Sequence, residues 1–130
     1  MTLDTSAILA ILLAEPEYPE FISYVENAKR ILVSTVSVLE ACLVMEARQG
    51  AEGGLDVDLF LKRINARVIA FDGEQLQYAR IGARLFGKGR HPAGLNFGDC
   101  ASYALSQWSG EPLLFKGNDF TLTDVQQVRG

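Results

Sequence analysis

The chain has 130 residues, a length typical of one domain, so we expect a single domain over residues 1–130. Hydrophobic residues make up 48% and charged residues 22%, which fits a globular protein and argues against disorder. The net charge of −4 lacks the basic excess of many nucleic-acid binders but does not exclude RNA, because carboxylates around a metal ion also count as negative charge. No apolar run reaches the roughly 18 residues of a membrane span, so we expect no membrane contact and a cytoplasmic location.

Strand and helix patterns alternate along the chain. Short apolar runs predict strands over residues 1–4, 31–34, 68–71 and 112–115. Helical spacing predicts helices over residues 7–14, 19–28, 35–48, 55–66, 73–86 and 97–108, with loops at 50–54 and 87–94. Asp72 and Gln75 have the spacing of a capping box at the start of one helix. The alternation predicts an α/β fold, a three-layer sandwich whose central, mostly parallel twisted sheet of four to five strands is flanked by helices.

Four acidic residues are predicted to meet at one edge of this sheet. Asp4 ends the first strand and Asp119 follows the fourth, while Glu40 and Asp99 lie in the first turns of helices that open on the same edge. Parallel sheets bind ligands beyond the carboxyl ends of their strands. Gathered carboxylates raise each other's pKa unless a cation lies among them, and Mg²⁺ and Mn²⁺ prefer oxygen ligands. The pattern therefore predicts a divalent metal site.

Each acid also has a structural explanation. Asp4 could cap the helix that follows it, and Asp119 could cap the last turn. Glu40 follows Ser37 by three residues, which is the spacing of a capping box. Asp99 lies where a negative charge suits a helix dipole. The two cysteines, Cys42 and Cys100, are expected to be reduced core thiols, since no metal-ligand spacing relates them.

Four stretches carry a more specific signal when they are taken in order. They are LDTSA at residues 3–7, VLEA at 38–41, LNFGDCASYA at 95–104 and LLFKGNDF at 113–120. Together they resemble the PIN-domain ribonucleases, most nearly the VapC-type toxins of bacterial toxin–antitoxin pairs, over essentially the whole chain. The resemblance implies a parallel sheet flanked by helices and an endoribonuclease that depends on Mg²⁺ or Mn²⁺. It also implies an RNA substrate, a homodimer and neutralisation by a small VapB-type antitoxin.

The resemblance also assigns roles to residues of this chain. The implied acidic quartet is Asp4, Glu40, Asp99 and Asp119. The first three would hold the ion, and one carboxylate would orient or deprotonate the attacking water so that cleavage leaves a 5′-phosphate. The implied supporting residues are Thr5, Ser6, Asn96 and Asn118. Asn118 departs from the family pattern, which often has an acid there, so the role of Asp119 could be exerted through water.

A basic cluster leads into the site near Asp99. It contains Arg80, Arg84, Lys88, Arg90 and His91. Because RNA binding needs positive charge near the phosphates, we hypothesise that Arg84, Lys88 and Arg90 hold the substrate backbone. The alternative is a solvated helix end whose cations suit the helix dipole. A lone histidine in such a loop is expected to be a surface residue rather than a catalytic base.

Three other function classes compete with the nuclease. A haloacid-dehalogenase-like phosphatase needs a second Asp where this chain has Ser6. A receiver domain could use Lys116, but no acidic pair opens the chain. A non-catalytic RNA-binding or interaction module on the same fold would have no need for clustered acids.

Overall fold

A single parallel sheet lies at the centre of the computed structural model, which describes residues 1–129. Its strands are β1 (Thr2–Leu3), β2 (Leu32–Ser34), β3 (Arg67–Ile69) and β4 (Leu113–Leu114). They lie in the order β3-β2-β1-β4, and every paired strand runs parallel to its neighbour. Leu3 of β1 lies between Val33 and Leu114, so β1 is a central strand. The predicted parallel sheet is confirmed.

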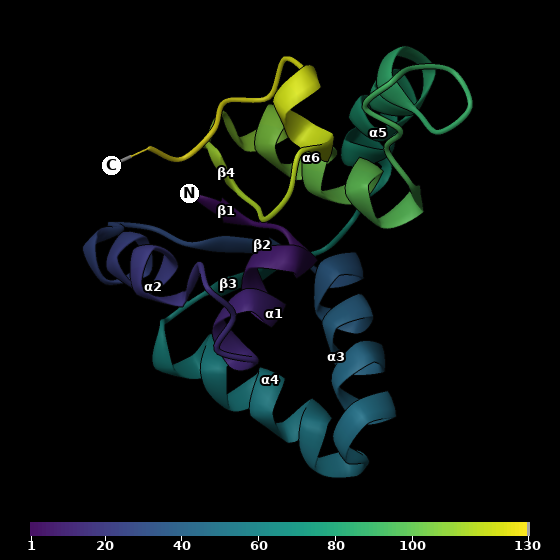
Figure 1. The fold of residues 1–130 in the computed structure, drawn as a ribbon. Helices are drawn as coiled ribbons and strands as arrows, with labels where there is room; N and C mark the ends of the chain where they lie inside the picture. Colours follow the sequence, from purple (N-terminus) through teal and green to yellow (C-terminus); the bar gives the residue numbers. More distant parts are fainter. Residues whose placement is uncertain (130) are drawn as a thin grey trace.

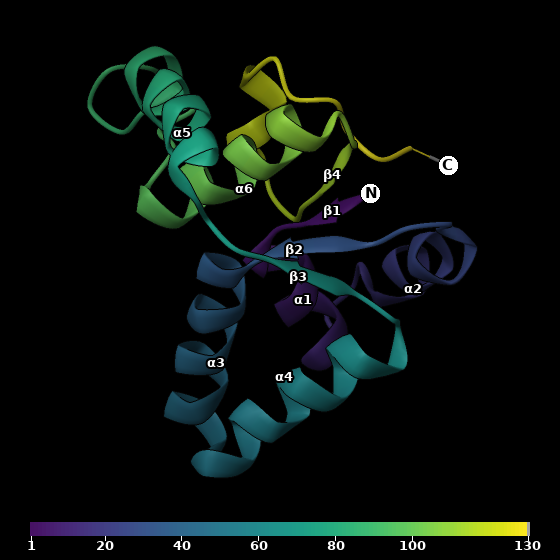
Figure 2. The same ribbon diagram turned by 180° about the vertical axis from the view of Figure 1, so that it is seen from behind.

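Helices cover both faces of the sheet, as Figures 1 and 2 show from opposite sides. One face carries α1 (Thr5–Leu12), α2 (Tyr18–Asn27), α3 (Thr35–Gln49) and α4 (Ala51–Arg63). The other carries α5 (Gly73–Phe86), α6 (Phe97–Ser109) and the short 3-10 helix η1 (Asp119–Leu122). This is the predicted three-layer arrangement. Within residues 1–129, no helix combines the length and apolar character that crossing a membrane demands.

The larger apolar core packs α1 to α4 against the sheet. Its most deeply buried large side chains are Leu3, Ile8, Val33, Met45 and Val57. A smaller cluster under α6 contains Leu95, Tyr103, Leu113, Phe120 and Val125. Each side chain of this size contributes about 1.5–3 kcal/mol when it is fully buried. The two clusters hold the central strands from both faces and thereby position the strand ends.

The start of α4 differs from the prediction. We expected a loop over residues 50–54 and a helix from residue 55, but α4 begins at Ala51 and only Gly50, with φ +73°, turns the chain. Gly53 and Gly54 are buried inside the helix. A Cβ at Gly53 would collide with the backbone carbonyl of Met45 on α3. The glycines therefore permit a close helix crossing, and packing overrides their low helix propensity.

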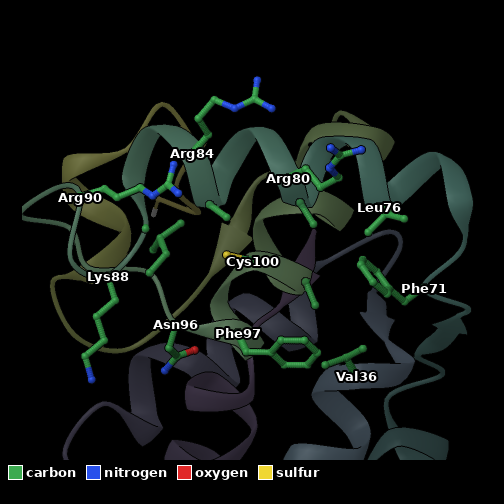
Figure 3. Close-up of a pocket in the computed structure, with 15 residues that line it drawn as sticks. Val36, Phe71, Leu76, Arg80, Arg84, Lys88, Arg90, Asn96, Phe97 and Cys100 are labelled. Carbon is green, nitrogen blue, oxygen red and sulfur yellow. The ribbon is translucent and has the colours of Figure 1, made fainter.

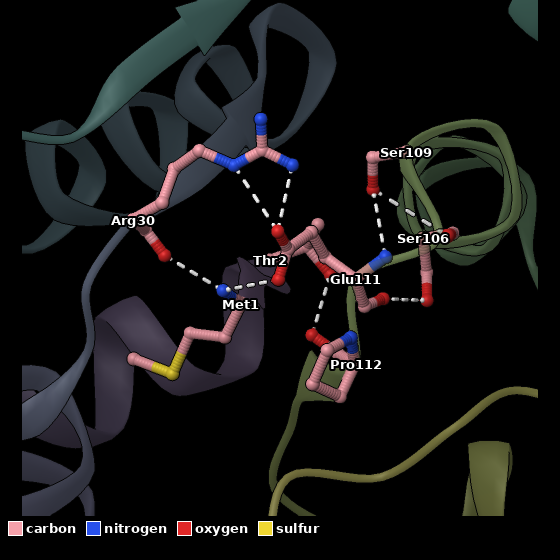
Figure 4. Close-up of polar contacts among 7 residues, drawn as sticks. All are labelled: Met1, Thr2, Arg30, Ser106, Ser109, Glu111 and Pro112. Carbon is pink, nitrogen blue, oxygen red and sulfur yellow. Dashed lines mark hydrogen bonds and ion pairs between the residues drawn. The ribbon is translucent and has the colours of Figure 1, made fainter.

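A polar network fixes the amino end of β1 (Figure 4). The α-amino group of Met1 donates to the carbonyl of Arg30 at 2.7 Å and pairs with Glu111 at 3.0 Å. The guanidinium of Arg30 pairs with the same carboxylate at 2.6 Å. The backbone N–H of Thr2 donates to the carbonyl of Pro112 at 2.8 Å. These contacts join the starts of β1, β2 and β4, so their carboxyl ends emerge together.

Candidate active site

Asp4 lies at the carboxyl end of β1 and is only 5% exposed. Its Oδ2 accepts hydrogen bonds from the backbone N–H of Ser6 at 3.0 Å and from the Ser6 hydroxyl at 2.6 Å. Its Oδ1 accepts from the hydroxyl of Ser102 on α6 at 2.5 Å. Asp4 is therefore the N-cap of α1, which begins at Thr5, two residues earlier than expected. These donors satisfy a buried charge and hold the carboxylate in one orientation.

Glu40 lies in the second turn of α3 rather than in the first. The helix begins at Thr35 because Ser34 is its N-cap, with the Ser34 hydroxyl oxygen accepting from the N–H of Val36 at 3.2 Å. The predicted first-turn position is wrong, and so is the alternative in which Ser37 and Glu40 form a capping box. Because the N-cap is Ser34 rather than Ser37, nearly one additional turn of α3 lies between the end of β2 and the Glu40 carboxylate.

Two residues from other helices face the Glu40 carboxylate. The hydroxyl of Thr5 on α1 donates to Glu40 Oε1 at 2.5 Å. Gly98 of α6 faces the same carboxylate, and a Cβ built on it would lie 2.6 Å and 2.7 Å from the two oxygens. Glycine is therefore needed at this position for Glu40 to lie where it does.

Asp99 is the third residue of α6 and forms a reciprocal capping box with Asn96. The N–H of Asp99 donates to Asn96 Oδ1 at 2.9 Å, and Asp99 Oδ2 accepts from the N–H of Asn96 at 3.0 Å. Burial first, and then the charges of Asp4, Asp119 and Glu40, together raise the pKa of Asp99 to about 6. Only the hydrogen bond from Asn96 opposes this rise in pKa. Asp4, Asp119 and Glu40 thus all lie within electrostatic reach of Asp99.

Asp119 opens η1 and is exposed. The preceding Asn118 makes no capping bond with its side chain, while its carbonyl accepts from the hydroxyl of Thr121 at 2.6 Å. No capping bond from the Asp119 side chain is formed among the described residues, so the expected cap of the last turn is absent. Asp119 acts on Asp99 through its charge, which contributes to the raised pKa of that residue.

The donor set suits a hard divalent cation in its chemistry. The charged groups that shift the pKa of Asp99 are all carboxylates. Lys116 does not neutralise them, since its Nζ pairs with Glu15 at 2.8 Å and Glu17 at 3.4 Å. As the side chains stand, no three Asp, Glu, His or Cys residues within 1–129 are placed to hold a metal ion. Ion binding therefore requires the carboxylates to approach one another, which a cation's attraction favours.

Ser6 and Lys116 are also the residues on which two competing classes depend. The phosphatase alternative needs an acid at position 6, where the serine hydroxyl instead donates to Asp4. The receiver alternative needs Lys116 at the acids, and its ammonium group is held by Glu15 and Glu17. The backbone N–H of Lys116 donates to the Ser6 hydroxyl oxygen at 2.9 Å, so Lys116 helps to position the hydroxyl that donates to Asp4.

Basic side chains surround a cavity of about 640 Å³ between α5, α6 and the start of α3 (Figure 3). The cationic residues that line it are Arg80, Arg84, Lys88 and Arg90. Its apolar lining includes Phe71, Leu76, Leu95 and Phe97. Asn96 connects the cavity with the acidic site, because it lines the cavity and is hydrogen-bonded to Asp99. The basic cluster therefore lies next to the acids.

His91 shapes the basic loop. Its Nδ1 accepts from the N–H of Ala93 at 3.0 Å, and its ring packs edge-on against Phe86 with centroids 5.2 Å apart. The two cysteines are free and half-buried, and Cys100 lines the cavity. Burial raises the pKa of both thiols, which disfavours the reactive thiolate.

Two buried serines were missed by sequence reasoning. Ser102 donates to Asp4, and its hydroxyl lies 3.2 Å from that of Ser37 on α3. Both residues are at most 1% exposed. The available signal was helical spacing, since Ser102 lies three residues after Asp99 on the same face of α6. A small polar residue there predicts a hydrogen bond only once the neighbouring strand is known.

A family model described as PIN domain matches residues 1–126, so the chain belongs to the PIN-domain family. Two similar relatives within that family are VapC ribonucleases. The chain is 49% identical over 128 residues to ribonuclease VapC30 of Mycobacterium tuberculosis, covering 98% of both chains. It is 48% identical to ribonuclease VapC of Mycolicibacterium smegmatis, covering 98% of this chain and 99% of the relative. The comparisons confirm the predicted VapC type and its function class, an endoribonuclease toxin of a toxin–antitoxin pair.

Solved structures support the same fold. The structure of VapC20 from Mycobacterium tuberculosis, described as a Sarcin-Ricin loop cleaving toxin, matches with a TM-score of 0.79 and covers 99% of this chain and 98% of its own. VapBC2 from Rickettsia felis, bound to a promoter DNA fragment, matches with a TM-score of 0.74, covering 98% of this chain and 96% of its own. Each is 16% identical to this chain, so the similarity concerns the fold alone.

Proposed function

We propose that the protein is a Mg²⁺- or Mn²⁺-dependent endoribonuclease in which Asp4, Glu40 and Asp99 hold the ion. The observation that carries this proposal is the pKa of Asp99, raised to about 6 by burial and then by three other carboxylates without an opposing basic side chain. Such a group of acids is unfavourable alone and becomes favourable around a cation. A bound Mg²⁺ or Mn²⁺ would lower the pKa of a coordinated water and stabilise charge on a phosphoryl oxygen.

The chain's own residues orient the acids for this chemistry. Ser6 and Ser102 hold both oxygens of Asp4, and Thr5 holds Glu40. Asp119 is exposed, so it is available to orient or deprotonate the attacking water. Hydrolysis by in-line displacement then leaves a 5′-phosphate on the RNA product.

RNA binding is assigned to the basic side chains beside the acids. Arg84, Lys88 and Arg90 would hold substrate phosphates, and RNA as substrate in turn supports a cytoplasmic location. Replacing both Lys88 and Arg90 with alanine should weaken RNA binding and lower the slope of log affinity against log salt by about 2 units. An unchanged slope would show that these cations are only a solvated helix end.

An antitoxin of VapB type is the proposed inhibitory partner, and a homodimer is the proposed assembly. Exposed apolar side chains on α3 and α4 support an interface with another protein on these two helices. They are Leu39, Leu43, Leu55 and Leu59, each between 57% and 60% exposed. Glu40 lies on α3 beside this face, so a protein bound there would obstruct the acids. Leu43→Asp with Leu59→Asp should abolish inhibition by the antitoxin encoded beside the toxin while sparing RNA cleavage.

The direct test is cleavage of RNA by the purified protein with and without Asp4→Asn. We expect metal-dependent cleavage to fall at least a hundredfold, since loss of a group that positions the reacting atoms has effects of this order. Asp72→Asn is the control, because Asp72 caps α5 and does not contribute to the pKa of Asp99. In a bacterium, Asp4→Asn should relieve the growth arrest caused by the toxin and remove the new RNA 5′ ends that cleavage produces. Growth arrest that survives Asp4→Asn would contradict the proposal.

A further inference from the structure

The cavity between α5, α6 and α3 has two features that the acidic site does not explain. The ring of Phe97 is 83% exposed, although an aromatic side chain of this size normally gains free energy from burial. Figure 3 shows the ring at the edge of the cavity beside Val36, with Asn96 next to it. An exposed flat ring at the rim of an apolar cavity is a surface on which another flat ring can stack.

The charge around the cavity is one-sided. Arg80, Arg84, Lys88 and Arg90 line it, and no Asp or Glu does. Within residues 1–129 none of these four side chains forms an ion pair, even though the chain carries more acidic than basic residues. Unpaired cations around an apolar interior match a ligand that is anionic outside and apolar within.

We propose that this cavity binds an unpaired nucleobase of the RNA, which stacks on Phe97 while Arg80 and Arg84 hold the adjacent phosphates. This inference rests on the proposed function and specifies its substrate. The cavity volume of about 640 Å³ lies within the range of small-molecule sites, and its lining residues Phe71, Leu76 and Leu95 are apolar like the face of a base. Proteins recognise single-stranded RNA by such stacking combined with a cationic surface.

The position of the cavity determines which nucleotide it binds. Asn96 lines the cavity and is hydrogen-bonded to Asp99, and Phe97 follows it in the chain. The stacked base therefore belongs to a nucleotide next to the cleaved phosphodiester bond. A base inside a double helix is paired and stacked on its neighbours, so it cannot enter. The substrate is accordingly a single strand or a loop.

A second protein chain is the competing occupant of an apolar cavity. The cores of protein interfaces are depleted of charged residues, whereas here four cations surround the apolar lining residues without opposing acids. A two-fold contact between copies brings the same patch against itself, so these cations would face one another and repel. The charge pattern therefore favours a polyanion over a second copy of this chain.

The test measures binding in EDTA, where cleavage is absent, by the fluorescence anisotropy of labelled strands. The probes are an oligouridylate and an abasic ribose-phosphate strand of equal length. Phe97→Ala should weaken oligouridylate binding about tenfold and leave the abasic strand unaffected, because stacking needs a base. Phe97→Trp should keep the affinity, since it keeps an aromatic face. Tyr18→Ala on α2 is the control, because Tyr18 is a 40% exposed aromatic residue that does not line the cavity.

Arg80→Ala should weaken both strands alike, because it removes a phosphate contact. Equal effects of Phe97→Ala on the two strands, or no effect on either, would overturn the proposal. It would also be overturned if Phe97→Ala converted a dimer to a monomer in light scattering without changing RNA affinity, since the cavity would then be a contact between copies. If the wild-type protein cleaves RNA but Phe97→Ala loses no affinity for oligouridylate relative to the abasic strand, the base site alone is refuted. Base-dependent binding without metal-dependent cleavage would refute the nuclease alone.

Discussion

Asp99→Asn should reverse its effect on stability when a divalent metal is added. The substitution removes a charge that burial and the other acids disfavour, yet it keeps an oxygen that can accept the hydrogen bond from the N–H of Asn96. Without metal, the variant should therefore be more stable than the wild type at neutral pH. With Mg²⁺ or Mn²⁺, the wild type should gain more, because it retains the full set of anionic ligands.

The size of the effect follows from the pKa of Asp99. A rise from 3.8 to about 6 spans roughly two pKa units, or about 3 kcal/mol at 1.36 kcal/mol per unit. Asp99 is only half-buried, so water and salt screen the repulsion and about 1 kcal/mol is the expected gain. The folded protein holds this proton more tightly than the unfolded chain. Wild-type stability without metal should thus fall as the pH rises from about 4 to 6, and Asp99→Asn should remove this fall.

Urea denaturation at constant ionic strength measures both parts of the prediction. In EDTA the midpoint for Asp99→Asn should lie above that of the wild type. In saturating metal the order should reverse, since a ligand at a hundred times its dissociation constant stabilises by about 2.7 kcal/mol. Asp72→Asn removes the same charge from another helix cap and should show no reversal. Equal stabilisation of wild type and Asp99→Asn by metal would refute Asp99 as a ligand, and no gain in EDTA would refute the repulsion.

Two further substitutions test the packing around the acids, and a third tests the crossing of α3 and α4. Gly98→Ala should leave the urea midpoint unchanged or raised while cutting RNA cleavage about tenfold or more, because the new methyl group displaces the flexible Glu40 carboxylate; full activity would contradict this. Ser102→Ala should destabilise the fold by about 1.5–3 kcal/mol in denaturation experiments, since it removes a hydrogen bond to the buried Asp4 charge, and a neutral effect would be the contrary result. Gly53→Ala should cost about 1–3 kcal/mol by forcing α3 and α4 apart, whereas a helix-propensity effect alone would raise the midpoint.

The parts of the fold that depend on chain-local rules could be predicted from the sequence. The strand ends at Asp4 and before Asp119 follow from short apolar runs, and the cap at Asp72 follows from its spacing to Gln75. Even there only half of the expected capping box forms. The N–H of Gln75 donates to Asp72 Oδ1 at 3.0 Å, but the Gln75 side chain donates to the carbonyl of Ala70 at 2.9 Å.

The parts that depend on contacts between distant segments could not be predicted. The start of α4 is set by how closely Gly53 lets the helix approach α3, which no local propensity reports. The turn that carries Glu40 is set by the choice of Ser34 over Ser37 as cap, and both are serines in plausible positions. Ser102 acquires a role only because β1 brings Asp4 beside α6. The start of α4, the position of Glu40 and the role of Ser102 therefore depend on which residues lie nearby in the folded protein, and not on residue type alone.

Capping and the proposed metal binding are not exclusive alternatives, because two of the proposed ligands take part in helix caps. Asp4 is the N-cap of α1, and Asp99 is the third residue of α6, in the capping box with the N-cap Asn96. The hydrogen bond from Asn96 lowers the pKa of Asp99 against burial and repulsion, and Ser6 and Ser102 donate hydrogen bonds to the Asp4 carboxylate. Helix N-termini thus supply positive potential that lets the fold gather carboxylates before any cation arrives. A site assembled in this way would keep the carboxylates of Asp4 and Asp99 oriented in the absence of a metal ion.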